Sequence, residues 1–199
     1  QYQLNGKATE RQVSIDEVLK EERWDYVITQ QASHDSGWMD TYEPFLGLLL
    51  EYVKEQLKQS SPHAEILLQE TWAYEMDSAH PNFMRYHRNQ EEMYERLKKC
   101  YYTMAEKYNL RLIPSGDIIQ KARQQEPFHV PSGGISLCRD GFHMSLFYGR
   151  YLLACVWMKT LFSVSAVGNP YVPEAEDGAE KAEEALLDRI RQIVDEGME

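Results

Sequence analysis

The sequence has few cysteines, and the three present (Cys100, Cys138 and Cys155) lie at unrelated spacings. They form neither a disulfide framework nor a zinc signature, and they slightly favour a reducing, cytoplasmic compartment. The chain also lacks an apolar run of about 18 residues, so we expect no membrane span. It opens on Gln rather than Met, with no signal-peptide pattern. We read it as a processed or truncated product.

Positive charge is scarce as well. The 199 residues include 21 Lys and Arg against 32 Asp and Glu, a formal net charge of −11. Because no basic stripe is present to meet phosphates, nucleic acid is excluded as a partner. Much of the negative charge lies in residues 174–199, where ten residues are acidic and three are basic. Apolar residues keep helical spacing there, which predicts an acidic amphipathic C-terminal helix rather than a partner-binding tail.

What the chain does contain is a series of short apolar runs typical of buried parallel strands, at residues 24–30, 64–68 and 111–114. Helical patterns separate and follow these runs. They cover residues 14–22, 42–59, a stretch from Met93 to Tyr108, 117–124 and 146–161. This order predicts an α/β fold, a three-layer α/β/α sandwich around a parallel sheet, in a single domain over residues 1–199.

Cap residues predict where four of the helices begin. Ser14 with Glu17 matches a capping box, and Thr41, Asp117 and Ser145 are good N-caps. Along the second helix, spacing predicts one buried side. Its residues are Phe45, Leu49, Tyr52, Val53 and Leu57.

Polar side chains gather after the predicted strands, at the edge where parallel sheets bind ligands. Asp140 lies three residues before His143, and a carboxylate there can fix the tautomer of the imidazole and stabilise its protonated form. Amide groups nearby could donate to a developing oxyanion, which favours acyl transfer. The converging residues are Gln30, Gln31, Ser33 and His34, then Gln69 to Tyr74, including Thr71 and Trp72, and then Ser115 and Asp117.

Three alternatives stay open. Ser33 or Ser36 could be the nucleophile, because each follows a buried strand. A metal could bind at histidines, although their spacings match no standard signature, so we expect neither metal nor cofactor. The candidate sets are His80 and His87 with Asp77, or His34 with Asp140. Finally, aromatic side chains could stack on sugars in a non-catalytic carbohydrate-binding module. These are Trp38, Trp72, Tyr74 and Phe142.

Several blocks, in a consistent order, resemble the SGNH or GDSL-type hydrolase superfamily. They are residues 24–33, 69–75, 113–116 and 140–145, with Gly149-Arg150-Tyr151 after them. The resemblance runs from about residue 20 to 173. Within the superfamily, the blocks most resemble a bacterial branch akin to carbohydrate acetylesterases. It implies a flavodoxin-like hydrolase in which His143 is the general base and Asp140 orients it. Gln30 or Gln31 would serve as oxyanion donor in place of the Gly-x-Asn pattern of that superfamily.

The resemblance also implies the reaction. It points to a serine esterase that hydrolyses short-chain acyl esters, chiefly acetyl, on a small molecule or carbohydrate. The implied pocket is lined by Ser33, His34, Thr71, Trp72 and Tyr74.

The superfamily carries its nucleophile in a Gly-Asp-Ser or Gly-Asn-Ser turn ahead of the first of these blocks, and no such turn precedes Trp24. We therefore expect the nucleophile and two N-terminal strands to lie upstream of Gln1. The chain alone would then be inactive and would expose an apolar sheet edge.

Overall fold

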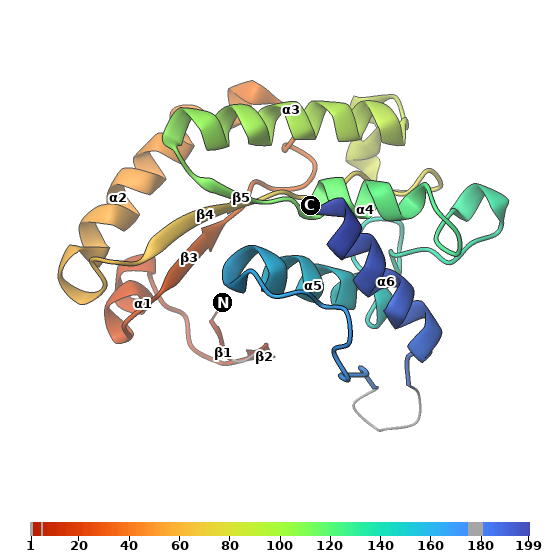
Figure 1. The fold of residues 1–199 in the computed structure, drawn as a ribbon. Helices are drawn as coiled ribbons and strands as arrows, with labels where there is room; N and C mark the ends of the chain where they lie inside the picture. Colours follow the sequence, from red (N-terminus) through yellow and green to blue (C-terminus); the bar gives the residue numbers. More distant parts are fainter. Residues whose placement is uncertain (1, 5, 175–180) are drawn as a thin grey trace.

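A computed structural model describes residues 2–4, 6–174 and 181–199. Its main sheet has three parallel strands in the order β3-β4-β5, which confirms the predicted parallel sheet in a mixed α/β fold (Figure 1). The strands are β3 (Tyr26–Thr29), β4 (Glu65–Gln69) and β5 (Arg111–Ile113). A separate antiparallel pair, β1 (Gln3–Leu4) and β2 (Lys7–Ala8), precedes them.

Helices connect and follow the strands. They are α1 (Ile15–Glu21), α2 (Phe45–Ser60), α3 (Gln90–Tyr108), α4 (Ser115–Arg123), α5 (Tyr148–Phe162) and α6 (Glu184–Gly197). Short 3-10 turns are η1 (Met39–Thr41), η2 (Pro81–Tyr86) and η3 (Val130–Ser132). Within the described ranges, none of the helices has the length and apolar character needed to cross a membrane.

Alternation along β4 divides the apolar core into two clusters, because successive side chains of a strand point to opposite faces. Leu67 packs in a cluster with residues of α4, α5 and α6. Ile66 and Leu68 pack with residues of α1, α2 and α3. Figure 1 shows α2 and α3 on one side of the sheet and α5 and α6 on the other.

The buried side of α2 differs from the prediction. Its buried residues are Leu46, Leu50, Val53 and Leu57, whereas Phe45 is 68% and Tyr52 42% exposed. The start of the helix is apolar almost all round, so spacing alone left its rotation open.

The predicted caps have mixed outcomes. The capping box of α1 is confirmed, since Ser14 N–H donates to Glu17 Oε2 at 2.7 Å. Thr41 does not cap α2: it lies in η1 and its hydroxyl donates to Asp35 O and Trp38 O. Asp117 lies inside the first turn of α4, which follows Pro114. Ser145 lies three residues before the first residue of α5, yet its Oγ accepts the Gly149 N–H at 2.9 Å and satisfies a donor of the first turn.

A C-terminal helix is present from Glu184 to Gly197, with Leu187, Ile190, Ile193 and Val194 buried, and residues 181–183 of the expected range precede it. Residues 175–180 of the predicted acidic segment lie outside the described residues.

Glu70, directly after β4, is a fully buried carboxyl. Its Oε2 accepts the Asp117 N–H at 2.8 Å, and within the described ranges its Oε1 has no partner. Burial and the nearby Asp117 carboxylate raise the pKa of Glu70 from 4.5 to about 8. Folding therefore favours the protonated form, and this contribution to stability, complete below pH 4.5, is lost as the pH rises through about 8.

We expect Glu70→Gln, which cannot ionise, to remove that dependence. Between pH 5 and pH 8, the unfolding free energy of wild type should fall by on the order of 3 kcal/mol relative to that of the variant, measured by urea titration. The control is Glu55→Gln, at an exposed carboxylate. It should leave the pH dependence of the unfolding free energy as in wild type. Parallel pH profiles for wild type and Glu70→Gln would show that Glu70 is ionised in the folded protein at neutral pH.

Candidate active site

The loop before α5 holds Asp140 and His143 in direct contact. Asp140 Oδ2 lies 2.7 Å from His143 Nδ1, while Oδ1 accepts the backbone N–H groups of His143 at 2.7 Å and Phe142 at 3.2 Å. Desolvation alone would raise the pKa of Asp140, but these hydrogen bonds outweigh it and lower the pKa to about 2. Asp140 is thus ionised at neutral pH, His143 carries its proton on Nδ1, and Nε2 is left to accept one.

Backbone and side-chain contacts fix this loop to the segment after β4. Trp72 Nε1 donates to Phe142 O at 2.8 Å, and Glu75 N–H donates to Gly141 O at 2.8 Å. Gly141 has φ +83°, and a Cβ there would lie 2.9 Å from Ser78 Cα. The tight turn therefore needs glycine.

A buried ion pair holds the segment after β4 in place. Arg123 Nη2 lies 3.0 Å from Glu75 Oε1, Arg123 Nη1 donates to Ala73 O at 2.8 Å, and both charged side chains are less than 5% exposed. Removing the cation leaves the Glu75 carboxylate buried without its counter-ion, which is costly in a low dielectric.

We expect Arg123→Met to lower the unfolding free energy by about 3–5 kcal/mol, measured by urea titration. The matched control is Lys58→Met, which breaks the exposed pair with Glu55 and should cost at most about 0.5 kcal/mol. Similar losses in the two variants would contradict a structural role for the buried pair.

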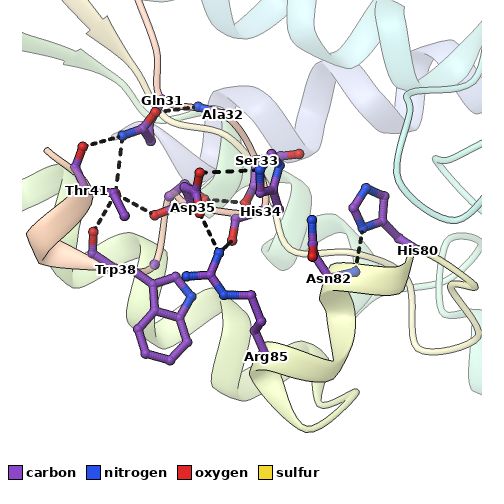
Figure 2. A network of polar contacts seen from close by, with 12 residues as sticks. Gln31, Ala32, Ser33, His34, Asp35, Trp38, Thr41, His80, Asn82 and Arg85 are labelled. Atoms are coloured by element: carbon purple, nitrogen blue, oxygen red, sulfur yellow. Dashed lines mark hydrogen bonds and ion pairs between the residues drawn. The ribbon is translucent and has the colours of Figure 1, made fainter.

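The loop after β3 carries a second network of polar contacts, shown in Figure 2. Asp35 pairs with Arg85 and lies 3.3 Å from His34 Nε2. Ser33 Oγ lies 3.0 Å from the hydroxyl of Tyr74. The structure thus brings Ser33, His34 and Tyr74 together as the sequence predicted. Asp35 and Arg85 were missed, although Asp35 directly follows His34.

The two glutamines point elsewhere. The Gln31 amide nitrogen donates to Thr41 O at 3.0 Å and to Thr41 Oγ1 at 3.2 Å, and its Oε1 accepts the Ala32 N–H. Gln30 and Gln31 line a pocket of about 120 Å³ between β3 and α2. No hydrogen bond among the described residues joins either glutamine to Asp140 or His143. Thr71 is also engaged, since Tyr101 donates to its hydroxyl at 3.3 Å.

Aromatic rings connect His143 to the other two loops. The Phe142 centroid lies 4.2 Å from His143, 4.8 Å from His80 and 5.7 Å from Tyr74. His80 lies 4.7 Å from Tyr74 and 6.2 Å from the parallel ring of His34. We call these five residues, His34, Tyr74, His80, Phe142 and His143, the imidazole cluster. From the sequence, His80 was proposed only as a metal candidate. Its place directly before Pro81, at the start of η2, was the signal for another role.

Neither candidate serine is bonded to His143. Ser33 is paired with Tyr74, and Ser36 is buried and donates to Ser33 O at 2.8 Å. Across the described part of the chain, no three His, Cys, Asp or Glu side chains are grouped to hold a metal ion. His87, one of the candidate metal ligands, instead has its Nδ1 2.8 Å from Glu92 Oε2.

The aromatic residues proposed to stack on sugars are already covered in two cases. Trp38 lies under the guanidinium groups of Arg85 and Arg96, at 4.9 and 4.7 Å from its ring. Tyr74 is fully buried. Tyr74 therefore offers no free face to a sugar, and two cations already contact the ring of Trp38.

Residues 2–187 match the model of DUF4886, a domain of unknown function. The chain belongs to the DUF4886 family. A crystal structure of a DUF4886 protein from Bacteroides uniformis superposes with a TM-score of 0.80 at 30% identity, covering 93% of this chain and 66% of that one. The chain thus spans slightly less than two thirds of that DUF4886 protein.

Two further structures are more distant. A protein from Slackia heliotrinireducens, described as a candidate SGNH hydrolase, gives a TM-score of 0.49 at 20% identity and covers 72% of this chain and 68% of its own. A candidate GDSL-like lipase from Parabacteroides merdae gives 0.45 at 26% identity, covering 61% and 49%. No curated protein matches this DUF4886 chain.

Proposed function

We propose that this DUF4886 chain forms the base-bearing part of an SGNH-type serine esterase with a flavodoxin-like, three-layer fold. The observation that carries the proposal is the Asp140–His143 pair, whose 2.7 Å contact holds the imidazole with Nε2 available as a base. The pair lies on a fixed loop beside residues that follow β3 and β4. A base oriented by a carboxylate is one part of the arrangement that nucleophilic acyl transfer requires.

The chemistry follows from that geometry. A serine hydroxyl loses its proton to His143 Nε2 as its oxygen attacks the ester carbonyl, and Asp140 stabilises the imidazolium. His143 then passes the proton to the departing alkoxide, leaving an acyl-serine. Water, deprotonated by the same nitrogen, releases the acid and regenerates the serine.

The serine itself, in this proposal, comes from outside the present chain. Two observations support this. Neither Ser33 nor Ser36 is bonded to His143, and within the described ranges β3 has a single partner strand, so one edge of it is free. An apolar groove of about 380 Å³, lined in part by Trp157 and Phe162 of α5, adjoins the sheet. A further strand beside β3 would end near the imidazole cluster.

The proposed substrate is a short-chain acyl ester, chiefly acetyl, of a carbohydrate or other small alcohol. His143 is 57% exposed as a side chain, so the alcohol portion can be bulky and polar without entering the core. The test is steady-state hydrolysis by the intact parent protein of p-nitrophenyl acetate, butyrate and octanoate and of an acetylated sugar. We expect kcat/KM to fall with acyl length. Sugar binding without turnover of any ester would favour the carbohydrate-binding module instead.

A further inference from the structure

His80 is held in one protonation state by its backbone surroundings. It is the N-cap of η2, where its Nδ1 accepts the Asn82 N–H at 3.2 Å. An acceptor nitrogen carries no proton, so the ring proton resides on Nε2. Figure 2 shows this contact, with the second ring nitrogen turned away from Asn82. Among the hydrogen bonds of the described residues, none engages Nε2.

The groups around the ring also favour its neutral form. Partial burial lowers the pKa of His80, and nearby His34 and His143 lower it further. The facing groups come from three loops: His34 after β3, Tyr74 after β4, and Phe142 with His143 before α5. Within the described residues no carboxylate contacts the ring to stabilise a cation. A neutral imidazole can donate a hydrogen bond without exchanging its proton.

We propose that His80 Nε2–H donates a hydrogen bond to the substrate's carbonyl oxygen as that oxygen becomes negative in the transition state. This assignment rests on the proposed esterase function. Phe142 lies 4.2 Å from the ring of His143 and 4.8 Å from that of His80, so the base and this donor both pack against one aromatic ring. The two glutamines expected in this role from the sequence line another pocket. A fixed donor beside the base is what oxyanion stabilisation needs.

Two isosteric variants separate this function from a structural role. Asparagine can keep the cap, because its short amide oxygen reaches the Asn82 N–H, but it loses the donor at the Nε2 position. Glutamine can place an amide N–H near the Nε2 position but loses the cap. In the intact parent protein, we expect His80→Asn to lower kcat about 100-fold with KM within about threefold of wild type. Its Tm should be unchanged.

His80→Gln should show the converse. We expect kcat within about tenfold of wild type and a Tm lower by about 3 °C, from loss of the cap. A purely structural His80 would give the opposite order, with His80→Asn active and His80→Gln impaired, and that result would overturn the assignment.

A second readout is independent of turnover. Nitrogen chemical shifts of His80, followed by NMR from pH 8 to pH 5, should still show an unprotonated Nδ1 at pH 6.5, the ordinary pKa of a histidine side chain. A proton on Nδ1 at neutral pH would refute the donor assignment whatever the activity. Wild type without esterase turnover would overturn the proposed function and the assignment with it. An active wild type with an equally active His80→Asn would overturn the assignment alone.

Discussion

Replacing His143 with alanine in the intact parent protein should lower kcat at least about 10³-fold, with little change in KM. The loss is this large because His143 Nε2 is proposed to take the serine proton and to return it to the leaving alcohol. Without it, both acylation and deacylation lack their base. Stability should hardly change, since the ring is exposed and makes one polar contact, with Asp140.

The matched control for this variant is His87→Ala. His87 is also an exposed histidine bonded to a carboxylate, that of Glu92 at 2.8 Å, but it lies outside the imidazole cluster. Its replacement should leave kcat and KM as in wild type. If His143→Ala turns over at a rate comparable with His87→Ala, His143 is not the base.

Asp140→Asn should lower kcat by up to about 10⁴-fold. The amide can donate to Nδ1 and so favour the wrong tautomer, and it provides no charge to stabilise the imidazolium. Since the pKa of Asp140 is about 2, the wild-type carboxylate is ionised throughout the range in which an esterase is assayed. No change of pH should therefore restore the activity of the variant.

Asp16→Asn provides the comparison, because Asp16 is an exposed carboxylate paired with Lys20 on α1. It should behave as wild type over the whole pH profile. An Asp140→Asn enzyme with wild-type kcat would show that the 2.7 Å contact orients nothing that matters to the reaction.

Local signals predicted the regular elements well. The three strands appear within two residues of the expected ends because their apolar runs are short and bounded by polar residues. The rotation of α2 was wrong because its first turns are apolar on every side, so only contact with the core selects Leu46 and Leu50 over Phe45. Asp117 was misplaced because Pro114 already sets the start of α4.

The site was predictable in part. The Asp140–His143 contact is local, three residues apart, and the sequence predicted it. The position of His80 is not local, since its neighbours come from loops 46 and 62 residues away in the chain, at His34 and Phe142. The partner of the Gln31 amide depends likewise on how the turn at Thr41 folds back. Pattern alone could not predict these long-range contacts.

The most direct measurement is covalent labelling of the intact parent protein by a fluorophosphonate, followed by mass mapping of the modified peptide. Wild type should be labelled on one serine, and His143→Ala at least about 10³-fold more slowly. Equal labelling rates in the two proteins, or no labelled serine in wild type, would contradict the account.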